Sequence, residues 1–344
     1  MKTLLAFDSF KGSLSAREAV EAAASVLPGE AVRLPLSDGG EGFTECMADA
    51  LGGTFRTIRV HGPLGRPVNA RYGLVRDGAV AIIETAAACG ITLLDRSEFD
   101  PWNASSFGVG EMIREAVSQH VEEIWIGLGG TAVMDAGKGM LEAVGPLPPS
   151  VRIHAFFDAD VPLTGPYGAA FVFGPQKGAD AEMVLRLDAR FRRLAGQWKD
   201  QYGIDVDSIP GAGAAGGIGA ALGVCLGAGM HHGIEAVLDA VDFRGKLSGC
   251  SLVITGEGKA DSQTLTGKVP YGVLQKAREY ALGIPVILVA GRVEDKAALL
   301  AAGFTDVIQI TPENELCGRG LEKEIATANL KRAVQDLADL RDQH

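Results

Sequence analysis

The stretch TLLAFDSFKGSLSAREAVEAAASVLPGEAVRLPLSDGGEG, residues 3–42, determines the fold class. Its apolar run Thr3–Phe7 predicts a strand, and the capping box Ser15–Glu18 begins a helix. Ala31–Leu36 predicts a second strand, which leads into the glycine turn Asp38–Gly42 and another helix. This order of strand, helix, strand and helix is typical of a parallel α/β sheet.

The pattern changes after this stretch and returns in the last third of the chain. Thr54–Val60, Val68–Val75 and Val80–Glu84 alternate around Gly-Pro and Asp-Gly turns, which predicts antiparallel hairpins. Ala181–Tyr202 predicts a long helix, and from about Ser251 strands and helices alternate again. We therefore expect an α/β protein of two domains, with a ligand-binding cleft between them. The expected Rossmann-like parallel-sheet domain comprises residues 1–55 and 246–344, and the expected mixed α/β domain comprises residues 56–245.

Composition and charge exclude several classes of protein. The chain has 344 residues, is 47% hydrophobic and carries a formal net charge of −11 without a run of Lys and Arg, so we expect no nucleic-acid partner. Its five cysteines include no CxxC pair, which favours free thiols and a cytoplasmic location. The uncharged segment Ala212–Met230 is rich in Gly and Ala and lacks basic or aromatic flanks, so we expect a glycine loop and a buried helix rather than a membrane span. His231 and His232 are expected at a helix end rather than in a metal site.

Two glycine motifs look like dinucleotide-binding fingerprints. Gly127–Ala132 reads GLGGTA after a predicted strand, and Gly211–Gly216 reads GAGAAG. The fingerprint also needs an acidic residue about 20 positions further on, where the first motif is followed by Pro146–Pro149 instead. No GxxxxGK[ST] sequence exists. NAD binding, as in a hydroxy-acid dehydrogenase, and a Walker A loop are therefore disfavoured.

Four other glycine-containing loops carry carboxylates and lysines. They are Asp8–Ser13, Asp38–Gly42, Thr255–Lys259 and Gln263–Lys268. Because loops that follow parallel strands share the carboxyl edge of the sheet, we expect these side chains to lie close together. Phosphoryl transfer requires backbone N–H groups and lysines for the phosphates, and carboxylates for Mg²⁺ and for the attacking hydroxyl. One such loop is more often only a turn, but four on one edge favour a phosphate or nucleotide site.

Six motifs taken together resemble the bacterial type I glycerate kinase family. In chain order they are DSFKGSLSA (Asp8–Ala16), LPLSDGGEG (Leu34–Gly42), GPLGRPV (Gly62–Val68), FGPQKGA (Phe173–Ala179), GAGAAGG (Gly211–Gly217) and VITGEGKADSQTLTGKVPYGV (Val253–Val273). The resemblance implies phosphorylation of D-glycerate, usually to 2-phosphoglycerate, with ATP and Mg²⁺ as cofactors. The partner is then a small hydroxy acid, and assembly into a homo-oligomer stays open.

The resemblance and the residue chemistry together suggest roles for side chains in these motifs. The candidate catalytic residues are Asp38, Lys11, Asp8 and Glu257, with Asp38 as the expected general base. The substrate-binding candidates, among them cations for the carboxylate of glycerate, are Ser9, Arg66, Lys177, Lys268 and Asp261. The segments expected to bind ATP phosphates contribute Gly129, Gly130, Thr131, Asp135, Gly213, Gly216 and Gly217. The candidate Mg²⁺ ligands are Glu41 and Asp158.

The middle of the chain departs from the family pattern. Where the family has GLGGSATNDGG, residues 127–137 read GLGGTAVMDAG, so that the apolar Val133 and Met134 replace two polar residues. A segment that family members usually carry between Val144 and Arg152 is also missing. Three interpretations follow: an active glycerate kinase, which we favour, a kinase for a related hydroxy acid, or a non-catalytic relative that binds a ligand.

Overall fold

The computed structural model describes residues 2–10, 12–40, 42–313 and 322–342, and it divides into two compact units. Unit 1 comprises Met1–Asp38 and Gly233–His344, and unit 2 comprises Gly39–His232. The expected boundaries fell after residue 55 and before residue 246. The observed ones come earlier in the chain, after Asp38 and before Gly233. The reason is packing, because α2 (Phe43–Ala50) contacts strands of unit 2 and α9 (Gly233–Ala240) contacts a helix of unit 1.

Unit 1 contains a five-stranded sheet in the order β11-β10-β9-β1-β2, in which every neighbouring pair is parallel. The strands are β1 (Lys2–Phe7), β2 (Glu30–Pro35), β9 (Leu252–Ala260), β10 (Val286–Val293) and β11 (Asp306–Gln309). The central strands are buried along most of their length, as is usual for a parallel sheet that helices cover on both faces. The predicted α/β domain built from both ends of the chain is confirmed.

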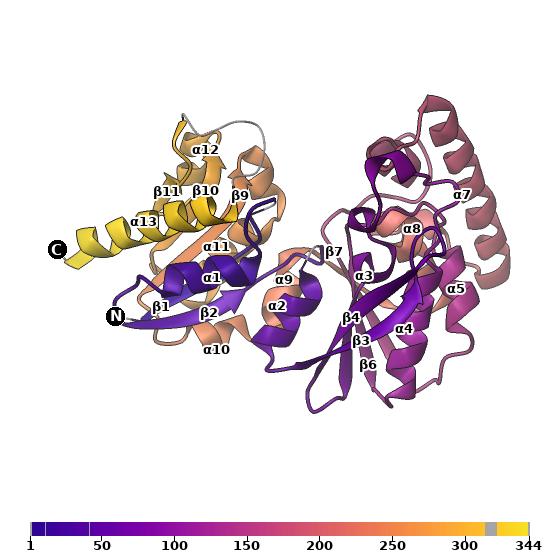
Figure 1. The fold of residues 1–344 in the computed structure, drawn as a ribbon, viewed down its shortest axis with the longest axis horizontal. Helices are drawn as coiled ribbons and strands as arrows, with labels where there is room; N and C mark the ends of the chain where they lie inside the picture. Colours follow the sequence, from indigo (N-terminus) through magenta and orange to yellow (C-terminus); the bar gives the residue numbers. More distant parts are fainter. Residues whose placement is uncertain (1, 11, 41, 314–321, 343–344) are drawn as a thin grey trace. The chain divides into compact units, whose positions relative to one another are not determined.

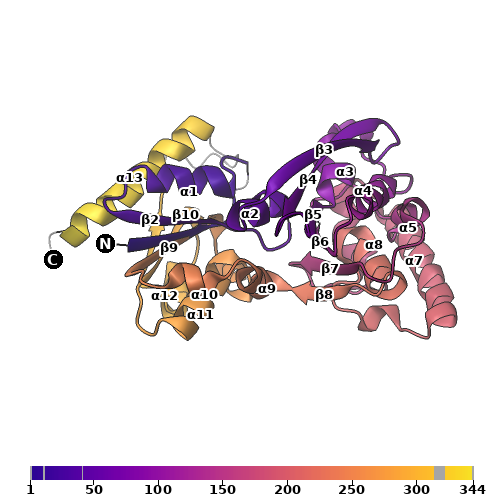
Figure 2. The ribbon, with the colours of Figure 1, turned by 90° about the horizontal axis from the view of Figure 1, so that it is seen from below.

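Helices cover the two faces of this sheet separately (Figure 2). On one face α1 (Ala16–Ala24) packs against α13 (Lys323–Asp342), and the predicted capping box of Ser15 and Glu18 starts α1. The other face carries α9, α10 (Phe243–Leu247), α11 (Val269–Tyr280) and α12 (Lys296–Ala302). The chain thus leaves β1 through α1 on one face and leaves β9 through α11 on the other. Adjacent strands whose connections diverge in this way form the topological switch point, where α/β sheets bind ligands.

Unit 2 contains a six-stranded mixed sheet in the order β3-β4-β5-β6-β7-β8. The strands are β3 (Thr54–His61), β4 (Pro67–Val75), β5 (Val80–Glu84), β6 (Glu123–Leu128), β7 (Arg152–Phe157) and β8 (Gly229–His232). The first three strands form the predicted antiparallel hairpins, whereas β5 to β8 are parallel. The strand β8 was not predicted, and the expected helix end at His231 and His232 is wrong because both residues pair with β7.

The α-helices of unit 2 other than α2 pack around one hydrophobic core that the parallel strands share. They are α3 (Ala86–Cys89), α4 (Phe107–Ser118), α5 (Lys138–Val144), α6 (Ala169–Phe173), α7 (Ala181–Tyr202) and α8 (Ala214–Ala220), whereas α2 contacts β4 and β5 through residues outside this core. The long helix predicted at Ala181–Tyr202 is confirmed. Within α8 three residues have left-handed backbone angles, and a π-helical turn, Ala221–Cys225, follows it.

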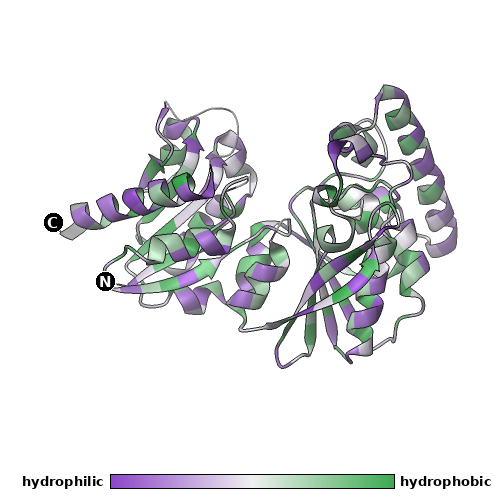
Figure 3. Cartoon of the chain, viewed as in Figure 1, coloured by the Kyte–Doolittle hydropathy of each residue, from purple (hydrophilic) through white to green (hydrophobic). Residues whose placement is uncertain are grey.

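The distribution of apolar residues agrees with this layering. Figure 3 shows apolar residues concentrated along the strands and polar residues along α7 and α13. No helix among the described residues is both long enough and apolar enough to span a membrane. The two units are labelled by element in Figure 1.

Candidate functional site

The carboxyl edge of the sheet in unit 1 gathers the predicted acidic residues. Asp8 directly follows β1, and its backbone N–H donates to the carbonyl of Gly256 in β9 at 3.0 Å. Asp38 follows β2, the other neighbour of β1. Glu257 was expected in a loop, but β9 continues to Ala260 and holds Glu257 within the strand. The three acidic residues thus come from three adjacent parallel strands and lie at the same edge of the sheet, as predicted. The candidates Lys11 and Glu41 lie outside the described residues.

Glu257 is a buried carboxylate with two polar partners. Its side chain belongs to a residue that is 4% exposed. The Thr264 hydroxyl donates to Oε1 at 2.6 Å, and Lys268 Nζ lies 3.6 Å from Oε2. Burial raises the pKa of Glu257 above its ordinary value, while the Thr264 hydrogen bond and the Lys268 charge act in the opposite direction. A carboxyl group in this setting is suited to proton transfer or to holding a cation at the switch point.

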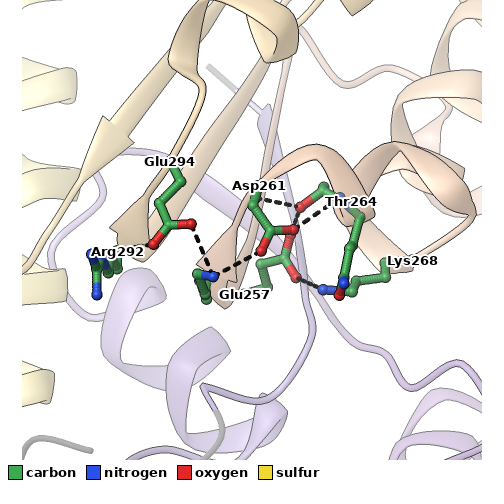
Figure 4. A network of polar contacts seen from close by, with 8 residues as sticks. Glu257, Asp261, Thr264, Lys268, Arg292 and Glu294 are labelled. Atoms are coloured by element: carbon green, nitrogen blue, oxygen red, sulfur yellow. Dashed lines mark hydrogen bonds and ion pairs between the residues drawn. The ribbon is translucent and has the colours of Figure 1, made fainter. Parts of the chain in front are cut away.

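A charged network surrounds the turn that follows β9 (Figure 4). Lys259 Nζ lies 3.0 Å from a carboxylate oxygen of Asp261 and 3.0 Å from one of Glu294. Arg292 in β10 pairs with Glu294 at 3.2 Å. Partial burial opposes the ionisation of Asp261, but hydrogen bonds from Lys259 and from the Gln263 N–H outweigh burial and hold the pKa of Asp261 below its ordinary value. Asp261, expected to bind substrate, therefore stabilises the turn in this structure.

Ser9 is placed by Asp8 at the same sheet edge. Its backbone N–H donates to Asp8 Oδ1 at 2.7 Å, so the carboxylate of Asp8 shapes the start of the loop after β1. Asp8 is buried, which is unusual for a carboxylate without a structural or chemical role. The combination of Asp8, Glu257 and Lys268 provides both signs of charge within one unit.

The glycine segment after β6 in unit 2 is held by a buried lysine. Lys177 Nζ donates to Thr131 Oγ1 at 3.1 Å and to the Val133 carbonyl at 2.9 Å. Lys177 is only 5% exposed, and burial lowers its pKa to about 8 although Cys89 and Asp135 oppose that shift. The side chain is thus engaged inside unit 2. Lys177 supports this loop in the structure, and its expected role as a substrate-binding cation stays a prediction.

Asp135 is likewise occupied by groups of the protein. Its carboxylate accepts hydrogen bonds from the Ser106 N–H and hydroxyl, both at 2.8 Å, and from the N–H groups of Gly137 and Gly139, both at 3.1 Å. These contacts join the starts of α4 and α5. Four hydrogen bonds to one carboxylate favour a structural role over the expected role in binding ATP.

Val133 and Met134 turn their side chains into the hydrophobic core, where both are 0% exposed. Their backbone carbonyls accept hydrogen bonds from cations instead, Val133 from Lys177 and Met134 from Arg190 in α7. Arg190 also donates to the carbonyl of Trp102 at 3.0 Å and stacks on its ring. The two apolar side chains therefore fill the core, and the backbone carbonyls of the same residues make the polar contacts of this loop.

The second glycine segment packs directly against the first. A Cβ atom on Gly216 would lie 1.9 Å from the Val133 carbonyl oxygen, and Gly216 has a φ of +69°. The N–H groups of Gly213 and Gly217 donate to the carbonyls of Val161 and Gly213, at 2.7 and 3.2 Å. These two amides are therefore engaged within the protein in this structure, and their expected contact with ATP phosphates stays a prediction. The close approach of the two chain segments explains why glycine is required at residue 216.

The remaining phosphate-binding candidates lie at the carboxyl end of β6. Gly129 lies so close to the backbone of Gly40 that a Cβ added to Gly129 would be 2.7 Å from the Cα atom of Gly40. The next residue, Gly130, has a φ of +64°. Asp158 follows β7, the neighbour of β6, on the same edge. Arg66, expected to bind substrate, is paired with Glu98 at 2.8 Å.

The structure can be tested for side chains that could hold Mg²⁺. The described part of the chain contains no group of three His, Cys, Asp or Glu side chains that could hold a metal ion. Mg²⁺ that is bound with nucleotide phosphates commonly uses only one or two protein carboxylates and keeps several waters. A single carboxylate such as Asp158 is therefore compatible with Mg²⁺ delivered by ATP.

Sequence reasoning missed four residues that organise these sites: Thr264, Glu294, Ser106 and Arg190. Thr264 lies within a recognised motif, but no pattern marks its hydroxyl as the partner of Glu257. Arg190 is one of several arginines along α7, and nothing in the helical periodicity distinguishes it.

The chain shares its sequence and fold with known proteins. The model of the Glycerate kinase family matches residues 3–147 and 146–341. A glycerate kinase of Bacillus subtilis (strain 168) is 40% identical over 348 aligned residues, which cover 91% of each chain. A glycerate 2-kinase of Escherichia coli (strain K12) is 39% identical over 343 residues, or 90% of each chain. A crystal structure of a protein assigned as glycerate kinase 2 from Salmonella typhimurium LT2 superposes with a TM-score of 0.86 at 38% identity, covering 100% of this chain and 98% of that one. The chain belongs to the glycerate kinase family.

Proposed function

We propose that this protein phosphorylates D-glycerate with ATP and Mg²⁺ and forms 2-phosphoglycerate in the cytoplasm. The observation that carries the proposal is the switch point of unit 1, where Asp8 follows β1, Glu257 lies in the neighbouring β9, and Lys268 Nζ is 3.6 Å from Glu257 Oε2. Two buried carboxylates on adjacent strands, one of them close to a lysine, suit the transfer of a phosphoryl group to a small acid. Family membership and the glycerate 2-kinase name of one relative support the acceptor and the product.

Each group contributes to a simple division of labour. Asp38 accepts the proton of the glycerate hydroxyl while the hydroxyl oxygen bonds to the γ-phosphorus of ATP. The bond from the γ-phosphorus to the β–γ bridging oxygen breaks, and ADP leaves. Lys11 and Lys268 neutralise the carboxylate of glycerate and the charge that develops on the transferred phosphoryl group. Ser9, Asp8 and Glu257 position the acceptor. Gly129, Gly130 and Thr131 would contact the phosphates of ATP, and Glu41 and Asp158 would hold Mg²⁺, which would neutralise phosphate charge.

The altered middle segment supports an active enzyme over a non-catalytic relative. Val133 and Met134 are fully buried, and the loop that they belong to is held by Lys177 and Arg190 through backbone carbonyls. Replacing polar side chains at these two residues therefore removes no group from a solvent-facing surface of unit 2.

The decisive test is a coupled ADP-release assay with ATP, Mg²⁺ and D-glycerate, in which phosphorus NMR identifies the product. We expect turnover that requires Mg²⁺ and a phosphorus signal from 2-phosphoglycerate. A signal from 3-phosphoglycerate would contradict the proposed product. Binding of ATP by calorimetry without turnover of glycerate would point to another hydroxy acid, and absence of both would point to a non-catalytic relative.

A further inference from the structure

We propose that Thr264 is a positioning residue of the phosphoryl-transfer site, which fixes the orientation of the Glu257 carboxylate through a hydrogen bond to Oε1. The inference rests on the proposed function, because it takes Glu257 to be part of that site. Thr264 lies in the 3-10 turn Ser262–Thr266 that follows β9, and its side chain is completely buried.

Hydrogen-bond geometry determines which way the Thr264 hydroxyl points. The backbone N–H of Asp261 donates to Thr264 Oγ1 at 3.0 Å, so the oxygen already serves as an acceptor there. A hydroxyl has one proton, and Glu257 Oε1 lies 2.6 Å away to accept it. This O···O distance falls in the range of hydrogen bonds from a hydroxyl to an ionised carboxylate, about 2.5–2.7 Å. The geometry therefore describes a chain of hydrogen bonds in which the Asp261 N–H donates to Thr264 Oγ1 and the Thr264 hydroxyl donates to Glu257 Oε1.

The turn itself is held rigidly, which makes the hydroxyl a fixed donor. The Thr264 N–H donates to the carbonyl of Asp261 at 3.0 Å. Asp261 Oδ1 accepts from the Gln263 N–H at 2.9 Å, and Asp261 Oδ2 is paired with Lys259. A donor that is anchored by its backbone orients its acceptor at a lower entropic cost than a long, mobile side chain does.

As a consequence, the two carboxylate oxygens of Glu257 have different partners. Oε1 is taken by Thr264, so that Oε2 is directed toward Lys268 and toward any group bound beside it. Because Glu257 is buried, its charged form depends on these contacts. Loss of the hydroxyl leaves Oε1 without this donor, and the carboxyl group is then expected to take up a proton or to rotate.

The experiment compares Thr264→Val, which removes the hydroxyl at nearly constant shape, with Thr264→Ser, which retains it. The matched control is Thr3→Val, because Thr3 in β1 is also buried and its hydroxyl has no hydrogen-bond partner among the described residues. In the full-length enzyme we expect Thr264→Val to lower kcat by about 10–100-fold, the value of one hydrogen bond to a charged group. Thr264→Ser and Thr3→Val are expected to stay within about threefold of the wild type in kcat, and KM for ATP is expected to change little in all three.

Two further measurements separate positioning from a structural effect. In a Glu257→Gln background, Thr264→Val is expected to add little to the loss of kcat, because the two residues act as a unit. Carbon-13 NMR of labelled glutamate would follow the titration of the Glu257 carboxyl, whose signal is assigned by its loss in Glu257→Gln. We expect this carboxyl to titrate at higher pH in Thr264→Val than in the wild type. Thr264→Ser and Thr3→Val are expected to match the wild type.

The outcomes also distinguish this inference from the proposed function. An unchanged Glu257 titration in Thr264→Val would overturn the inference, as would equal losses of kcat in the presence and absence of the Glu257 carboxylate. A wild-type protein that does not turn over glycerate but shows the expected order of titrations would overturn the proposed function alone.

Discussion

Asp38 is the residue on which the proposed chemistry depends most directly. It follows β2 at the carboxyl edge of the parallel sheet, one strand away from Asp8. Replacement by asparagine keeps the shape of the side chain but removes a proton acceptor. We expect Asp38→Asn to lower kcat by about 10²–10⁴-fold, as steady-state kinetics would measure. Asp77→Asn, in the exposed turn between β4 and β5, is the matched control and is expected to leave kcat unchanged. A normal rate in Asp38→Asn, with an unchanged circular dichroism spectrum, would exclude Asp38 as the base.

Lys177 makes a residue-scale prediction about stability and pH. Its pKa of about 8 in the folded protein lies below the ordinary value of 10.5, so between these pH values the unfolded chain binds more protons than the folded one. The free energy of unfolding is therefore expected to rise with pH over this window, by about 3 kcal/mol from this residue. Urea unfolding at several pH values would show that the free energy of unfolding of the wild type, relative to that of Lys177→Met, rises over this window. Parallel pH profiles of the two proteins would show that Lys177 is not buried as described.

At the scale of elements, the contact between the two glycine segments of unit 2 gives a sharp prediction. Gly216→Ala would place Cβ 1.9 Å from the Val133 carbonyl oxygen at a residue whose φ is +69°. We expect a loss of about 3 kcal/mol or more in the free energy of unfolding, because overpacking and a left-handed backbone combine. Gly196→Ala is the control, since an added Cβ in the middle of α7 meets nothing within 4 Å. It is expected to stabilise the protein by about 0.5–1 kcal/mol through helix propensity. Equal stability of the two variants in urea would contradict this account of the contact.

For the whole molecule, the two units have separate hydrophobic cores, one around β5 to β7 and one around β1, β9 and β10. A local defect is therefore expected to remain within its own unit. Hydrogen exchange followed by mass spectrometry is expected to show faster exchange in residues 39–232 of Gly216→Ala and wild-type rates in residues 1–38 and 233–344. Faster exchange of β1 and β9 to the same degree would indicate that the units unfold together.

Much of the fold follows from local patterns in the sequence. The capping box at Ser15 starts α1, alternating residues form the hairpins of β3 to β5, and the apolar runs form β1 and β2. Acidic residues that follow such strands reach one sheet edge by topology alone, which places Asp8, Asp38 and Glu257 without any knowledge of side-chain contacts. The strand β8 escaped prediction because it is short and depends on pairing with β7, which lies more than 70 residues earlier in the chain.

By itself, the sequence determined the α/β class, the family and the edge of the sheet that carries the acidic residues, because these depend on periodicity and on motifs of neighbouring residues. Only the tertiary structure decided which charged residues face inward. Lys177 donates a hydrogen bond to Thr131, which is 46 positions away in the sequence. Asp135 accepts one from Ser106, 29 positions away, and Arg190 donates one to the Met134 carbonyl, 56 positions away. Burial and long-range hydrogen bonds thus engage Lys177 and Asp135, two candidate ligand-binding residues, in holding a loop of unit 2, together with Arg190, which no sequence pattern had marked. They also give Thr264, a residue with no signal of its own, a fixed place beside Glu257, because desolvation acts on a side chain only once distant segments have closed around it.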